Sequence, residues 1–333
     1  MAWMVAAESG AAQTRFLLFM ACIVGAIALG YAARRTGVLD PSWARHIMSA
    51  AIVGCDAPIG WLAIWFLRVP PGVWKVPTAG AVAGVLTCLA GLAVARWRRM
   101  PPETAAVFGL QGGMGNVGYT LGGAIAFALW GLQGLALEQM FCMMWPFFSF
   151  LFCFPIGRHY AEAAAGRREA VSPAVYALRT LGRSLTDLRS LPLYTATLGL
   201  VLNLAGVAPP EAVRRAGVID ILMVVGILMQ FGGVGMTVRA RRLPAFWKPA
   251  LGSAALKFLA SPAVMLGVTL ALGLTGEPLY VCLLLAAMPT ALYSVLMANL
   301  FGLERDLANT TFILTHAIAL GVVGLLALAW HAR

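Results

Sequence analysis

Two helix-breaking stretches interrupt otherwise apolar segments of this 333-residue chain. The first is glycine-rich and covers residues 109–123, and the second surrounds Pro289 within the apolar stretch 279–312. Glycine costs about 1 kcal/mol relative to alanine in a helix. Proline costs about 3 kcal/mol, because it removes a backbone hydrogen bond and clashes with the carbonyl four residues back. Where a helix restarts, it presents free N–H groups and the positive end of its dipole. Two such interruptions therefore favour the binding of a carboxylate or another anion.

Polar side chains lie in or beside both interruptions and could supply oriented hydrogen-bond donors. They are Asn116, Tyr119 and Thr120 at the first interruption, and Thr290, Tyr293 and Ser294 at the second. Pro289 and the seven glycines from Gly109 to Gly123 are the residues that we expect to open the two helices. The alternative interpretation of the glycines is close packing between membrane helices.

Three ionisable residues inside apolar segments are further candidates for chemistry. Lys257 is the strongest candidate, because placing a cation at the middle of a bilayer costs roughly 3 kcal/mol on insertion scales. It could pair with an anionic ligand, pair with Asp56, or titrate; the alternative is that its ammonium extends to the membrane boundary. His316 could relay protons, or it could be a hydrogen-bonded packing residue.

Residues 113–118 also spell the pattern GxGxxG, with Glu138 further along the chain. A dinucleotide site requires a preceding strand and a βαβ unit. Here the pattern lies within one apolar segment and another apolar segment follows. The sequence therefore argues against nucleotide binding and favours an unwound helix.

Composition places the chain in a membrane. The mean hydropathy is +0.84 and 11% of the residues are charged, against about 25% in soluble domains. About 20 apolar residues are needed for one crossing. Ten segments meet this requirement, at 16–33, 47–67, 76–95, 104–130, 137–156, 191–207, 218–238, 249–274, 279–300 and 307–330.

The net charge of +11 is concentrated in short segments between the apolar runs, which indicates membrane orientation and not nucleic-acid binding. The clusters at 34–35, 96–99, 158–189 and 239–248 all fall on one side, so we expect both termini on the non-cytoplasmic side of a cell (inner or plasma) membrane. We do not expect residues 1–14 to form a cleaved signal peptide, because they lack a basic start.

Five crossings in each half predict two repeats inserted in opposite senses. The first is 1–156, the second is 190–333, and a basic cytoplasmic loop, 157–189, joins them. We expect this loop to contain an amphipathic helix at the membrane interface. A short echo supports the division, because the residues at 300–304 resemble those at 129–133.

Four stretches resemble the auxin efflux carrier family. GYAARRTGVLDPSWAR at 30–45 is similar to its opening signature, and GNVGYTLGGAIAFALWG at 115–131 is similar to its fourth-helix motif. LKFLASPAVMLGVTLALGL at 256–274 and LLLAAMPTALYSVLMANLFG at 283–302 are similar to its helices eight and nine. The resemblance extends over essentially the whole chain.

This resemblance implies an all-α membrane fold of ten helices in two inverted five-helix repeats. Helices one, two, six and seven would form a scaffold, and the others a mobile transport domain in which broken helices four and nine cross at the substrate site. Bacterial relatives are linked to malonate and malate, and plant relatives to indole acetate. By match, Asn116 is the polar crossover residue, Pro289 is the ninth-helix break, and Lys257 lies where relatives often carry Lys or Arg. Gly123 occupies the position of the family's fourth-helix proline.

We therefore predict a secondary transporter or facilitator of a small organic anion, working by elevator-type alternating access. We expect no enzymatic activity, cofactor or metal site. Lys257, Asp56 and His316 are candidates for proton coupling; the membrane potential alone is a second driving force, and sodium is disfavoured because few acidic residues are available. The expected partners are the anion, the lipid bilayer, protons and, in a homodimer, a second copy of the chain. The alternatives are a non-transporting membrane sensor or anchor and an intramembrane enzyme.

Overall fold

The computed structural model describes residues 2–40, 42–67, 69, 72–166, 172–237 and 243–331. Within these ranges the regular elements are all helical. The first half contains α1 (Ala2–Arg35), α2 (Trp43–Ala51), η1 (Ile52–Asp56), α3 (Ala57–Trp65), α4 (Lys75–Trp97), α5 (Pro102–Gly113), η2 (Tyr119–Gly123), α6 (Ala124–Cys142), α7 (Trp145–Phe147), η3 (Phe148–Cys153) and α8 (Phe154–Ala164). The second half contains α9 (Pro173–Leu185), η4 (Leu188–Ser190), α10 (Leu191–Leu204), α11 (Glu211–Arg215), α12 (Val218–Thr237), α13 (Leu243–Ala255), η6 (Leu256–Ala260), α14 (Ser261–Ala271), α15 (Gly276–Ala286), α16 (Leu292–Phe301) and α17 (Arg305–His331).

Several helices have the length and apolar character of membrane crossings. By these two criteria the described residues contain six candidates, which are Phe16–Arg35, Trp43–Trp65, Lys75–Trp97, Leu121–Ala164, Val218–Thr237 and Pro244–Ala271. Two shorter apolar helices, α15 and α16, occupy the segment that contains Pro289. The described part of the chain thus has the all-helical character of a multi-pass membrane protein, as the composition predicts.

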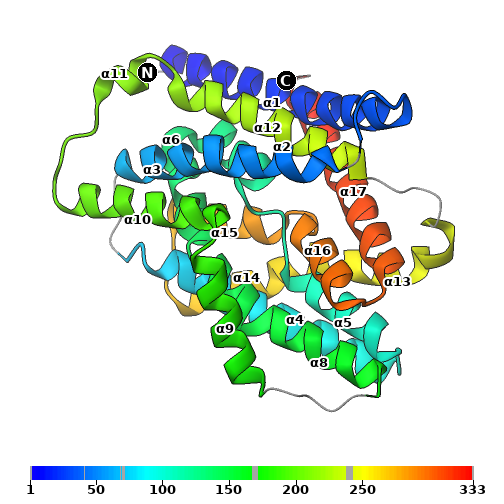
Figure 1. The fold of residues 1–333 in the computed structure, drawn as a ribbon. Coiled ribbons are helices and arrows are strands. Elements are labelled where there is room, and N and C mark those ends of the chain that lie inside the picture. The colour runs from blue at the N-terminus through cyan, green and yellow to red at the C-terminus, as the bar shows by residue number, and fades with distance from the viewer. Residues whose placement is uncertain are drawn as a thin grey trace.

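The helices pack in two groups. In the first, which we call the flanking group, α1 lies along α12, and the α2–α3 helix lies against α10 and α12 (Figure 1). In the second, the crossover group, α4 and α5 pack together with α8 and with α13 to α17. Helix α6 contacts both groups, through α1 and α3 on one side and α4 and α15 on the other. The two groups therefore meet along α6.

Three helices contain a π-helical turn that ends two residues before a proline. The turns η1, η3 and η6 precede Pro58, Pro155 and Pro262. A proline cannot donate a backbone hydrogen bond and crowds the carbonyl one turn back, and a wider turn accommodates both defects. Asp56 ends η1, and Lys257 lies within η6. Both charged candidates therefore sit where proline disturbs a helix.

The sequence echo corresponds to a shared backbone feature. Gly131 interrupts α6 with φ of 59°, and Gly302 ends α16 with φ of 69°. Positive φ is a conformation that glycine adopts readily. Both copies of the echo therefore place a glycine where the helix after an interruption terminates.

The segment 157–189, predicted as a basic loop, is largely helical where it is described. Helix α8 continues to Ala164, and α9 begins after Ser172, whose hydroxyl accepts a hydrogen bond from the Val175 N–H. The guanidinium of Arg158 lies 4.3 Å from the centre of the Tyr176 ring, a cation–π contact between α8 and α9. These two helices therefore form a hairpin rather than an extended linker.

The flanking group depends on glycine contacts between α1 and α12. A Cβ at Gly30 would overlap the carbonyl oxygen of Gly232, and a Cβ at Gly235 would overlap that of Ile27. Small residues allow the backbones of membrane helices to approach closely.

We predict that Gly30→Ala lowers the melting temperature of the purified protein, because the added methyl forces α1 away from α12, at about 1–3 kcal/mol. Gly25→Ala on the same helix is the matched control, because no atom lies within 4 Å of its Cβ position. Differential scanning fluorimetry of both variants in detergent measures the effect. Equal melting temperatures for the two variants would contradict the close packing of these helices.

Candidate functional site

The two predicted interruptions are present and they touch each other. Helix α5 ends at Gly113 and the helix resumes at Tyr119, while α15 ends at Ala286 and α16 begins at Leu292. The intervening segments form an isolated antiparallel bridge between Gly115 and Thr290. We call this contact, formed by residues 114–118 and 287–291, the crossover.

Two backbone hydrogen bonds hold the crossover. The Asn116 N–H donates to the Pro289 carbonyl at 2.6 Å, and the Ala291 N–H donates to the Met114 carbonyl at 2.8 Å. Each unpaired backbone group would cost several kcal/mol in lipid. The interruptions therefore satisfy part of each other's backbone.

Helix α17 supports the crossover from behind. The Thr315 hydroxyl lies 2.9 Å from the Thr290 hydroxyl and also accepts a hydrogen bond from the Thr290 N–H at 3.2 Å. The Gln111 amide donates to the Ser294 hydroxyl and to the Ala308 carbonyl, both at 3.1 Å. Thr290 and Ser294 are fully buried in these contacts. Their hydroxyls therefore brace the crossover.

Asn116 and His316 form one pair across the same junction. The His316 Nδ1 lies 2.8 Å from the Phe312 carbonyl, an acceptor, so Nδ1 carries a hydrogen. The other ring nitrogen, Nε2, then accepts from the Asn116 amide at 3.2 Å. His316 thus fixes the orientation of Asn116 as a neutral, hydrogen-bonded residue.

A large open cavity, which we call the vestibule, leads to the crossover. Its volume is about 1470 Å³, and its walls include Gly115, Asn116, Gly118 and Ala291. Its basic residues come from segments that the charge distribution assigns to the cytoplasmic side. They are Arg34, Arg45, Arg183, Arg189 and Arg305, and its acidic residues are Asp56, Glu138, Asp187 and Asp306.

Both restarting helices begin at the vestibule wall. Gly118 precedes η2 and Ala291 precedes α16, and both residues line the cavity. The positive ends of two helix dipoles are therefore close to the vestibule. Tyr293 lines it as well, with its ring packed against Phe150 and Phe154.

Four further predicted site residues belong to the crossover or to the helix that follows its first segment. Gly123 is buried at the junction of η2 and α6, and Pro289 is buried within the crossover. The side chains of Tyr119 and Thr120 lie outside the described residues, although their backbone forms η2.

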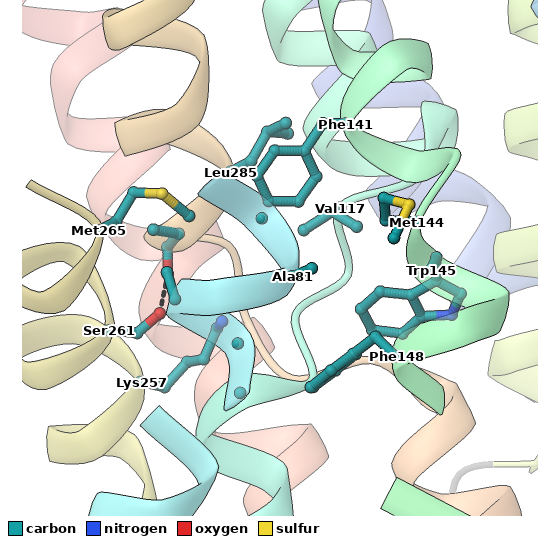
Figure 2. A pocket seen from close by; sticks show the side chains of 15 residues that line it. Ala81, Val117, Phe141, Met144, Trp145, Phe148, Lys257, Ser261, Met265 and Leu285 are labelled. Carbon is teal, nitrogen blue, oxygen red and sulfur yellow. Dashed lines mark hydrogen bonds between the residues drawn. The ribbon is translucent and has the colours of Figure 1, made fainter. Parts of the chain in front are cut away.

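Lys257 lies behind the crossover, in a second and much smaller cavity. The side chain is 1% exposed, and it makes no hydrogen bond or ion pair with a described residue. The cavity has room of about 30 Å³, and its walls are mainly apolar, including Val117, Phe141 and Phe148. Figure 2 shows the Lys257 nitrogen directed away from its helix into this space. About 10–15 Å³ suffices for one water, so the ammonium can be hydrated by very few water molecules.

One glycine separates this ammonium from the vestibule. A Cβ at Gly115 would lie 2.8 Å from the Lys257 Nζ, and Gly115 also lines the vestibule. The absence of a side chain therefore lets the positive charge approach the crossover closely. Lys257 does not extend to the membrane boundary, and it does not pair with Asp56.

A carboxyl pair in the vestibule wall was not predicted as a site. Asp56 interacts electrostatically with Glu138 of α6, and Glu138 is fully buried. The Gln139 amide donates to Glu138 Oε2 at 2.8 Å, and the Cys142 thiol donates to Oε1 at 3.0 Å. Glu138 appears in the sequence only as an acidic residue in an apolar run, and its proximity to Asp56 depends on the packing of α6 against α3.

The second half of the chain has the sequence pattern of a transport protein. Residues 185–326 match the family described as "Membrane transport protein". Together with the helical membrane fold, this match makes the second half of the chain similar to membrane transport proteins.

Comparison with individual proteins indicates a more specific family than the family model does. The chain is 29% identical over 165 residues to "Probable auxin efflux carrier component 9" of Oryza sativa subsp. japonica, with 48% of this chain and 39% of that protein covered. It is 28% identical over 169 residues to "Auxin efflux carrier component 6" of Arabidopsis thaliana, with 48% and 29% covered. It is 30% identical over 135 residues to "Auxin efflux carrier component 3a" of Oryza sativa subsp. japonica, with 39% and 22% covered.

These matches confirm the resemblance drawn from the motifs: the chain is related to the auxin efflux carrier family. The aligned part spans about two fifths or less of each of these curated relatives.

We predict that Gly115→Ala and Lys257→Ala are coupled energetically. In the native background the added methyl meets the buried ammonium, whereas Lys257→Ala removes that ammonium. The coupling energy between contacting residues is about 0.5–3 kcal/mol. Denaturant unfolding of the two single variants and the double variant gives this value.

Gly118→Ala is the matched control, because no atom lies within 4 Å of its Cβ position in the same unwound segment. It should leave stability unchanged in both backgrounds. Additive effects of Gly115→Ala and Lys257→Ala would refute the contact between Gly115 and the ammonium.

Proposed function

We propose that this protein is a secondary transporter of a small organic anion carrying a carboxylate, bound at the crossover on the vestibule side. The observation that carries the proposal is the convergence of two helix N-termini and the Lys257 ammonium on one short stretch of unwound backbone. Fixed positive dipole ends and a buried cation favour a negative ligand without requiring a flexible charged side chain.

The proposed binding residues differ in what they contribute. Asn116, held by His316, lines the vestibule and offers an oriented amide. Tyr293 contributes a half-buried ring and hydroxyl to the same wall, and Tyr119 and Thr120 belong to the first restarting helix. Thr290 and Ser294 act indirectly, by holding the unwound backbone in place, and Gly123 and Pro289 permit the two interruptions.

The proposed transport cycle is of the elevator type. In the present conformation the vestibule opens toward the basic segments and reaches the crossover. The flanking group resembles a scaffold, and the crossover group resembles a unit that could carry the site across the membrane. In this arrangement the two halves of the chain are inverted five-helix repeats, 1–156 and 190–333, and the vestibule faces the cytoplasm with both termini on the other side.

The substrate class follows from the site and from the relatives. Proteins related to this chain are named for auxin efflux, and auxin-type molecules are carboxylates with an apolar body. The vestibule combines basic residues with apolar and aromatic walls, which suits such amphiphilic anions. A screen of purified protein for thermal stabilisation by mono- and dicarboxylates, followed by counterflow in proteoliposomes, tests the proposal directly. No stabilisation and no counterflow with any carboxylate would refute it.

We predict that Asn116→Ala raises the dissociation constant of the stabilising carboxylate by about tenfold, because a hydrogen bond to a charged group contributes about 1.5–3 kcal/mol. Isothermal titration or ligand-dependent melting measures the constant. Asn299→Ala is the control, because the Asn299 amide donates to the Val295 carbonyl of its own helix. An unchanged constant in Asn116→Ala would move the binding site away from the crossover.

A further inference from the structure

The carboxyl pair Asp56–Glu138 joins the two helix groups. Asp56 ends the π-helical turn η1, whose neighbours include α12 and α10 of the flanking group. Glu138 lies on α6, which begins directly after the crossover. A displacement of the crossover group that carried α6 along would separate the two carboxyl groups.

The pair has no basic partner. Neither carboxyl forms an ion pair with any residue that the structure describes, and the titratable groups that interact with the pair are Cys55 and Cys142. The amides of Gln230 and Gln139 approach it from α12 and α6. From α10, the Thr195 hydroxyl donates to the Ala57 carbonyl instead. Among the charged residues of the vestibule wall, Asp187 caps η4 and Arg189 lies within it; η4 packs against η1, but neither carboxyl of the pair forms an ion pair with Arg189.

An orphaned acceptor indicates a missing hydrogen. Asp56 Oδ2 lies 3.4 Å from the Gln230 amide, but Oδ1 is shielded from solvent and accepts no hydrogen bond within the described chain. Glu138 is 0% exposed. A buried carboxylate and a half-buried one in the same site repel each other, and neutralising one of them removes this repulsion. A bound proton supplies this neutralisation, and an unsatisfied carboxylate oxygen is the atom that can take it up.

We propose that the Asp56–Glu138 pair forms a proton-binding site that holds one proton in the vestibule-open state. The proton converts one carboxylate to a carboxylic acid and leaves the other ionised, so the pair carries one negative charge instead of two. This lower charge favours an anion entering the same vestibule, so the proton and the anion bind together. The coupling of proton and anion rests on the proposed function. In the proposed elevator cycle Glu138 moves with the anion, whereas Asp56 stays with the flanking group. The consequence is symport of one proton with each anion.

The proton site is testable without transport. Infrared difference spectra of the purified protein, recorded while pH is varied, should show the carbonyl stretch of a protonated carboxylic acid. The band should disappear in Glu138→Gln and shift or disappear in Asp56→Asn. Glu211→Gln, which removes an exposed carboxylate paired with Arg214 at 2.7 Å, should leave it unchanged. A spectrum that is identical in Glu138→Gln and the native protein would overturn the proton site.

The coupling is testable with radiolabelled malonate in proteoliposomes whose membrane potential is clamped at zero. An acidic exterior with about a tenfold proton gradient should drive about tenfold accumulation for one proton per anion. Glu138→Gln should lose this accumulation and retain exchange of malonate at equal pH, because the amide resembles the protonated acid. Accumulation that persists in Glu138→Gln, or exchange by the native protein without any response to the gradient, would overturn the coupling.

If Glu138→Gln does not fold, the same accumulation measurement is made with Asp56→Asn, which removes the other carboxyl group of the pair. If the native protein exchanges no malonate and the infrared band is present, malonate is excluded as the substrate and the proton site stands.

Discussion

The structure depends on the mutual satisfaction of two interrupted helices. Backbone N–H and C=O groups cannot remain unpaired in a bilayer, yet the segments 114–118 and 287–291 both leave the helical conformation. The antiparallel bridge between Gly115 and Thr290, with its two flanking hydrogen bonds, resolves this conflict. Neither interruption would be stable alone, so each one requires the other at the same depth.

This constraint explains why polar residues gather around the crossover. Thr315, Gln111 and His316 complete the hydrogen bonds of Thr290, Ser294 and Asn116. Because most donors and acceptors are used internally, only a few groups remain directed toward the vestibule. The crossover is therefore polar on its vestibule side and sufficiently braced to keep its shape in an apolar medium.

Charge is distributed on two sides of the crossover. Lys257 lies behind it in a nearly dry cavity, and its charge acts on the vestibule through Gly115, which has no side chain. Asp56 and Glu138 lie in the vestibule wall where the two helix groups meet. In the proposed function a fixed cation near the crossover and a neutralisable anionic pair at the boundary between the groups are complementary, because the first would attract an anion and the second would make its binding depend on protons.

The sequence by itself determined the class of fold and the position of both interruptions. Glycine and proline act locally, since their backbone restrictions do not depend on neighbours, so Gly113–Gly118 and Pro289 could be identified from residue type alone. Low charge content and long apolar runs determined the membrane environment for the same reason. The sequence similarity around Gly131 and Gly302 could also be recognised from residue types alone. Glycine adopts positive φ readily, so this backbone feature is a local one.

Only the tertiary structure decided which polar residues face the vestibule and which brace the crossover. Thr290 and Asn116 have similar surroundings in the sequence, but Thr290 bonds to α17 while Asn116 lines the cavity. The sequence also could not predict the carboxyl pair, because Asp56 and Glu138 come together only through the packing of α6 against α3. Hydrogen bonds between helices and electrostatic contacts over long sequence separations depend on how the helices pack, and this packing is not encoded in the local pattern of residue types.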